Sequence, residues 1–137
     1  MIKKNRLLNI IKTGFTLTEI LIVVIIIGIL ATLALPMLVK TLEKAKLGEA
    51  ASNLNLIRTG EKIYFLENSF FTTDIDSLNI ENPNTGAKYF DYTVPAGDTD
   101  DFTARAQRRS NAPNPYKTYY YDIDKSGTIT SNGPLSP

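Results

Sequence analysis

Residues 14–39 read GFTLTEILIVVIIIGILATLALPMLV, and this stretch decides the fold of the 137-residue chain. No charged residue occurs in the twenty positions from Ile20 to Val39. Twenty helical residues span about 30 Å, which is the thickness of the hydrocarbon core of a bilayer. The first half of the run is rich in β-branched residues, but in lipid only a helix satisfies its own backbone groups. The stretch therefore predicts a membrane-spanning helix over residues 15–39.

The charge distribution around this stretch predicts its orientation. The first fourteen residues contain four basic residues and no acidic one: Lys3, Lys4, Arg6 and Lys12. The remaining 11 basic and 14 acidic residues leave residues 15–137 with a net charge of −3. A basic leader stays in the cytoplasm while the segment after the span crosses the membrane. We therefore expect residues 40–137 to form a globular head on the far side.

The composition excludes several classes of function. The chain has neither cysteine nor histidine, which excludes disulfides, thiolate metal sites and imidazole catalysis. Its serines and threonines consequently lack a histidine base, and no paired carboxylates have an interpretable spacing, so we do not expect an enzyme. A net charge of +1 and three arginines near a group of tyrosines are too little for a nucleic-acid partner to be expected. These arginines are Arg105, Arg108 and Arg109.

Helical periodicity continues beyond the apolar run. Ala50, Leu54, Ile57 and Tyr64 recur at steps of four, three and seven, which places them on one helix face. Charged residues surround this stripe, and Glu43 and Lys46 have the spacing of an i,i+3 ion pair. We predict one helix from about Phe15 to Glu67, with its first half in lipid and its second half amphipathic, ending at Asn68-Ser69.

The rest of the chain predicts a loop over residues 69–88 and a β-meander over residues 89–131. Period-2 alternation predicts strands near residues 90–94, 102–106 and 119–123, with a short return strand at 128–130. The expected fold class is α+β: a long N-terminal helix packed on a small antiparallel sheet of three or four strands. The stripe on the second half of the helix is the available cover for the sheet.

The N-terminal pattern resembles that of type IV pilins and type II secretion pseudopilins over about residues 12–40. The resemblance is carried by the basic leader ending in Gly14, by Phe15, by Glu19 and by the apolar run with Pro36. It implies the pilin fold, removal of leader 1–14 by a prepilin peptidase between Gly14 and Phe15, and N-methylation of Phe15. It also implies as partners other copies of the chain, the peptidase/N-methyltransferase, and an assembly platform with its ATPase.

The resemblance gives Glu19 a role in assembly. An acid at the edge of a membrane span, such as Glu19, costs free energy, and in the centre of the helix the cost reaches about 2.5–3.5 kcal/mol. Glu19 therefore needs a partner, and cleavage would create one in the amine of Phe15. In the family that partner belongs to a neighbouring subunit. The alternative is a glutamate that snorkels to the headgroups without a function. Gly28 and Pro36 imply either an ordinary kink or local unwinding in a fibre core.

The expected function is that of a structural subunit of a type IV pilus, located in the inner membrane as a single-pass precursor and then in the filament. A pseudopilin of a type II secretion system is the alternative, in which case the filament is a pseudopilus. A secreted or membrane-anchored monomeric binding protein is the remote third interpretation. No cofactor is expected except calcium at Asp122 and Asp124, where the alternative is a plain turn with Gly127 in the left-handed conformation.

Overall fold

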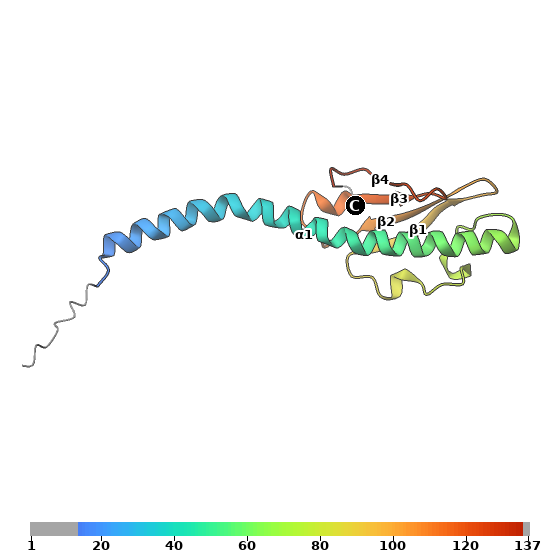
Figure 1. Cartoon of the computed structure of the whole chain (residues 1–137), viewed down its shortest axis with the longest axis horizontal. Helices are drawn as coiled ribbons and strands as arrows, with labels where there is room; N and C mark the ends of the chain where they lie inside the picture. Colours follow the sequence, from blue (N-terminus) through green and yellow to red (C-terminus); the bar gives the residue numbers. More distant parts are fainter. Residues whose placement is uncertain (1–13, 136–137) are drawn as a thin grey trace, which may run out of the picture. The chain divides into compact units, whose positions relative to one another are not determined.

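The computed structural model describes residues 14–135 and consists of one long helix and a four-stranded sheet (Figure 1). The helix α1 runs over Leu17–Asn68, and the strands are β1 (Phe90–Gly97), β2 (Phe102–Arg108), β3 (Tyr120–Ile123) and β4 (Ile129–Ser131). Three short 3₁₀ turns lie at Ile75–Ser77, Pro83–Thr85 and Tyr116–Thr118. The chain divides between Leu38 and Val39 into two compact units. The basic residues of leader 1–14 lie outside the described residues, and only Gly14 is described.

The first unit contains the N-terminal part of α1. This part is long and apolar enough to cross a membrane, and its side chains are exposed. The helix is continuous through Gly28 and Pro36. Pro36 has no N–H to donate to the carbonyl of Thr32, and the hydroxyl of Thr32 donates to the carbonyl of Ile29 at 2.7 Å.

The second unit is a β-meander covered by the later turns of α1. The strand order is β1-β2-β3-β4, and every neighbouring pair is antiparallel. The buried and exposed positions alternate along β1 and β2, so one face of the sheet is apolar, as the period-2 pattern predicted. The register of β1 against β2 shifts between Thr93 and Ala96, where a β-bulge adds local twist.

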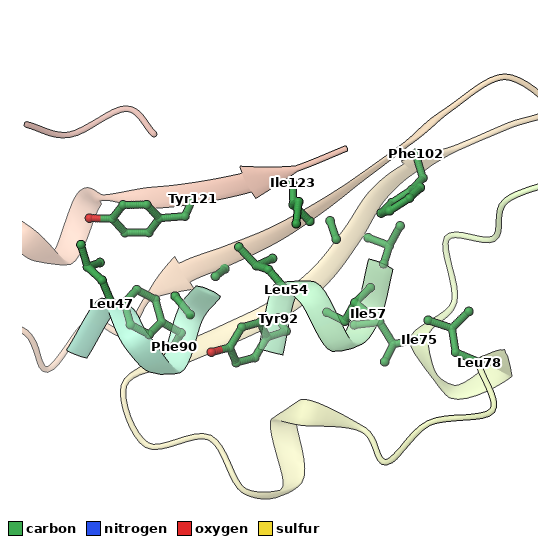
Figure 2. Packing of buried hydrophobic residues seen from close by; sticks show 14 of the residues in the cluster. Leu47, Leu54, Ile57, Ile75, Leu78, Phe90, Tyr92, Phe102, Tyr121 and Ile123 are labelled. Atoms are coloured by element: carbon green, nitrogen blue, oxygen red, sulfur yellow. The ribbon is translucent and has the colours of Figure 1, made fainter. Parts of the chain in front are cut away.

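The hydrophobic core lies between α1 and this sheet. Figure 2 shows Leu47, Leu54 and Ile57 on α1 beside aromatic and aliphatic side chains of the strands, with Ile75 and Leu78 of the loop closing one end. Leu54 and Ile57 are 0% exposed. The predicted stripe on α1 is confirmed, although Tyr64 at its end is only partly buried. The predicted helix end at Asn68-Ser69 is also confirmed, with Ser69 at φ 63°.

Two charged residues correct the expectation of a purely polar surface around the stripe. Glu43 and Arg108 are 4% and 5% exposed and form a buried ion pair, with Arg108 Nε 3.0 Å from Glu43 Oε2. Glu43 also forms the predicted i,i+3 pair, because Lys46 Nζ lies 2.6 Å from its Oε1. The helical pattern placed Glu43 outside because its partner is 65 positions away in the sequence.

Candidate functional site

The candidate site is the N-terminus of α1, where Thr16 and Glu19 cap the helix reciprocally. The carboxylate Oε2 of Glu19 accepts hydrogen bonds from the backbone N–H and the hydroxyl of Thr16, both at 2.8 Å. In return, the hydroxyl of Thr16 accepts from the backbone N–H of Glu19 at 3.2 Å. This arrangement is a capping box, which satisfies helix N–H groups that have no partner within the helix.

The capping box fixes where the negative charge of Glu19 lies. Its carboxylate is turned back toward the first residues before the helix, and the positive end of the helix dipole favours a negative charge there. The sequence predicted a role for Glu19 but missed Thr16. The signal was present, because Thr16 and Glu19 have the T-x-x-E spacing of a capping box immediately before an apolar run.

Gly14 and Phe15 lie directly before the capped turn, outside the helix. The Phe15 side chain is 81% exposed, and no atom lies within 4 Å of the place where a Cβ on Gly14 would be. A peptidase needs an accessible backbone that is free to extend, and both conditions hold here. Cleavage between these residues would place a new amine on Phe15, one residue before the amide of Thr16 that binds Glu19.

The helix surface behind this site is apolar on every side. Each large apolar side chain from Leu17 to Leu38 is between 48% and 86% exposed. Glu19 carries the only charge between residues 15 and 39. A helix that is hydrophobic all round must be covered by lipid or by other helices. Gly28 and Pro36 lie within this surface in a continuous helix, and their unwinding in an assembled fibre stays a prediction.

The two carboxylates suggested for calcium have separate local partners. Asp122 binds Arg105 through two hydrogen bonds of 2.7 Å. Asp124 Oδ1 accepts from the amides of Gly127 and Thr128 at 3.1 and 3.3 Å and thereby closes the β3–β4 turn. Gly127 has φ 91°, as the alternative interpretation of a turn predicted. Within residues 14–135 no three acidic side chains gather as a metal site, so calcium binding stays a prediction.

Each of the three arginines is paired with a carboxylate. Arg105 pairs with Asp122, Arg108 with Glu43, and Arg109 with Asp91 at 2.8 Å. Arg108 is in addition buried, and its Nη1 donates to the carbonyl of Tyr89 at 2.6 Å.

Comparison with known proteins places the N-terminal site in a recognised pattern. Residues 12–35 match the prokaryotic N-terminal methylation motif. Over 88 residues the chain is 36% identical to the type IV major pilin protein PilA of Myxococcus xanthus, covering 64% of this chain and 40% of that protein. Over 67 residues it is 39% identical to the type II secretion system core protein G of Vibrio cholerae, covering 49% of this chain and 46% of that protein.

The fold has a counterpart among solved structures. It is similar to the non-core minor pilin PilV of Neisseria meningitidis with a TM-score of 0.55 and 22% identity, covering 71% of this chain and 93% of that one. The matches to the two curated relatives span less than half of their length. The chain is thus similar in fold to a minor pilin and in sequence to a major pilin and to core protein G.

Proposed function

We propose that this chain, a homologue of type IV pilins and of type II secretion core protein G that carries their N-terminal motif, is a structural subunit that polymerises into a type IV pilus. The observation that carries the proposal is an all-round apolar helix with a single acid, Glu19, capped at its N-terminus. Such a helix is stable in lipid as a monomer and in a bundle of its own copies as a filament core.

Processing precedes assembly in this proposal. A prepilin peptidase removes leader 1–14 by cutting between Gly14 and Phe15, and the new amine of Phe15 is methylated. The precursor is a single-pass protein of the inner membrane, and an assembly platform with its ATPase draws the processed subunit into the filament. The exposed, non-helical Gly14-Phe15 segment supports this step.

Glu19 then directs the register of assembly. Its carboxylate, which the Thr16 capping box holds at the helix end, pairs with the Phe15 amine of a neighbouring copy. The pair neutralises two charges that would each be costly in an apolar bundle. Because only one acid is available along the apolar helix, only one axial register satisfies it.

A test compares Glu19→Ala with Glu67→Ala, which removes an exposed glutamate from the other end of α1. Filaments sheared from cells are separated from membranes, and the chain in each fraction is measured by immunoblot and N-terminal sequencing. We expect Glu19→Ala to yield processed chain that begins at Phe15 and stays in the membrane, whereas Glu67→Ala assembles. Filaments of normal abundance from Glu19→Ala, or filaments that retain residues 1–14, would contradict the proposal.

A pseudopilin of a type II secretion system is the second candidate, because core protein G from several bacteria matches the chain at 35–40% identity. The same helix and the same acid would serve a pseudopilus. Deletion of the gene separates the two: loss of surface filaments with normal secretion supports a pilus, and loss of secreted proteins supports a pseudopilus. For a monomeric anchored binding protein, deletion of the gene would affect neither filaments nor secretion, and the protein would tolerate Glu19→Ala.

Calcium binding at Asp122 and Asp124 is a separate proposal. Calcium would have to displace Arg105 from Asp122, which is held by two short hydrogen bonds. Thermal unfolding of the full chain in detergent micelles with and without calcium tests it. A rise in Tm that Asp124→Asn abolishes would support the site, and an unchanged Tm would reject it.

A further inference from the structure

Glu61 is a buried acid that has no role in the proposed filament assembly and belongs to none of the ion pairs described for the head. It lies on the core face of α1 and is 0% exposed. Its Oε2 accepts one hydrogen bond, from the backbone N–H of Thr72 at 3.1 Å. Its Oε1 is buried and has no hydrogen-bond partner. A buried carboxylate without a compensating cation is costly in its ionised form.

The partner of Glu61 belongs to a segment that is packed on both sides. Residues 71–72 lie between α1 and the β1–β2 hairpin: the Phe71 ring stacks on Phe65 of α1 with centroids 4.6 Å apart. The Phe71 amide donates to the carbonyl of Asp98 in the hairpin at 2.8 Å. The approach is so close that a Cβ on Gly97 would lie 2.7 Å from the carbonyl oxygen of Thr72.

Glu61 has no ion-pair partner in the described part of the chain. None of the four salt bridges within residues 14–135 includes it. Charged groups on the same helix and on the adjoining segments have other partners or are exposed. Arg58 donates to the carbonyls of Lys125 and Ser126, Lys62 is exposed, Asp74 caps the 3₁₀ turn at Ile75–Ser77, and Asp98 accepts from the amides of Asp100 and Asp101.

Burial therefore raises the pKa of Glu61 to about 7, against a smaller lowering by the hydrogen bond from Thr72. When residues 71–72 leave α1, the carboxyl meets water and its pKa returns toward the ordinary value of 4.5. Because the pKa of Glu61 is higher while residues 71–72 are packed against α1, protonation of Glu61 stabilises this packed state. The stabilisation is complete below about pH 4.5 and is lost as the pH rises through 7.

We propose that Glu61 acts as a proton-operated latch, which holds residues 71–72 against α1 while it is protonated and releases them when its proton passes to solvent. Release withdraws the Phe71 ring from Phe65 of α1 and from Phe102 of β2, whose ring centroid lies 5.2 Å away. Leu47, Leu54 and Ile57 keep their packing against the sheet. Residues 71–72 would thereby detach from α1 more often near neutral pH. This inference is independent of filament assembly.

The test is backbone hydrogen exchange of the full chain in uncharged detergent micelles between pH 5 and 8.5, corrected for intrinsic exchange rates. The difference between pKa values of about 7 and 4.5 makes opening about tenfold more frequent at pH 8 than at pH 6. We expect the protection of the Thr72 amide to fall by that factor. At every pH it should also remain below the protection of the β2 amides, because the segment opens without the sheet.

Two variants sharpen the result. Glu61→Gln cannot ionise, so the corrected protection of Thr72 should become independent of pH. Glu49→Gln is the matched control, because Glu49 also accepts backbone amides, from Lys88 and Tyr89 at 3.1–3.2 Å, but is not fully buried. Its pH profile at Thr72 should equal that of the unaltered chain.

Titration of Glu61 in the unaltered chain, followed by the NMR shift of its carboxyl carbon, keeps the proposal testable if a variant fails to fold. A midpoint near 7 that coincides with the loss of Thr72 protection supports the latch. A midpoint near 4.5 overturns it. Equal protection at Thr72 and in β2 at every pH also overturns it, because residues 71–72 would then open only when the whole head unfolds.

Discussion

Replacing Glu43 by methionine tests the buried ion pair that joins α1 to the sheet. Glu43 and Arg108 are 4% and 5% exposed, and two hydrogen bonds of 3.0 and 3.3 Å connect them. The guanidinium retains the carbonyl of Tyr89 at 2.6 Å and lies 5.5 Å from the centres of the Tyr89 and Phe90 rings. The variant therefore leaves a buried positive charge that is only partly solvated by the protein.

Loss of one partner of a buried ion pair costs about 3–5 kcal/mol. We expect about 3 kcal/mol for Glu43→Met, because the Tyr89 carbonyl still accepts from Arg108. For a domain of about a hundred residues, each kcal/mol lowers Tm by roughly 4–8 °C. The expected fall in Tm is therefore about 12–24 °C, measured by thermal unfolding of the full chain in detergent micelles and followed by the near-UV circular dichroism of its tyrosines.

The double variant Glu43→Met/Arg108→Met decides whether the cost arises from the unpaired charge. It replaces both charges by apolar groups of similar length, so it should be more stable than Glu43→Met alone. Asp91→Asn is the control, because the Asp91–Arg109 pair is 60% and 32% exposed and its loss should cost less than about 1 kcal/mol. The reasoning is refuted if Glu43→Met lowers Tm by less than about 4 °C, or if the double variant is as unstable as the single one.

Three further outcomes are expected. Gly97→Ala should destabilise the head by about 1–3 kcal/mol in denaturant unfolding, since its Cβ would meet the Thr72 carbonyl at 2.7 Å. Gly86→Ala is the control: no atom lies within 4 Å of the place of its Cβ, so it should change stability by less than about 0.5 kcal/mol. Thr16→Ala should cost about 1 kcal/mol of helix capping and speed hydrogen exchange in the first turn of α1 about fivefold, without a change in Tm of the head. Burial acts to raise the pKa of Glu43, but Arg108 and Lys46 outweigh burial and lower that pKa. The ionised Glu43 therefore stabilises the unaltered chain, and this stabilisation is lost as Glu43 is protonated at low pH. The Glu43→Met/Arg108→Met variant should accordingly lose less stability than the unaltered chain between pH 5 and pH 3, measured by denaturant unfolding.

Much of the fold follows from local pattern. The single helix ending at Asn68-Ser69, the loop over residues 69–88 and an antiparallel meander of three or four strands were predicted, because the helix and the strands each repeat their apolar residues with their own period. Features that depend on pairing with another strand or helix were not predicted. β1 continues to Gly97, beyond the predicted end near Val94, because β2 pairs with it past the bulge.

The functional candidates likewise comprise residues that local spacing identifies and one residue, Glu61, whose burial it does not predict. Gly14, Phe15 and Glu19 are identified by a contiguous pattern, and even the missed Thr16 belongs to a local spacing. Glu61 also follows the stripe, seven positions after Leu54 and four after Ile57, but an acid at such a position suggests a helix edge rather than a core.

Local sequence is enough to predict that the apolar run from Ile20 to Val39 is helical, because twenty uncharged positions leave the backbone no other way to satisfy its hydrogen bonds in lipid. It also determined the alternation that gives the sheet one apolar face. Which charges are buried depends on the tertiary structure. Glu43 meets Arg108 and Glu61 meets Thr72 across 65 and 11 positions, and the free energy of a buried charge depends on the groups that the fold brings beside it.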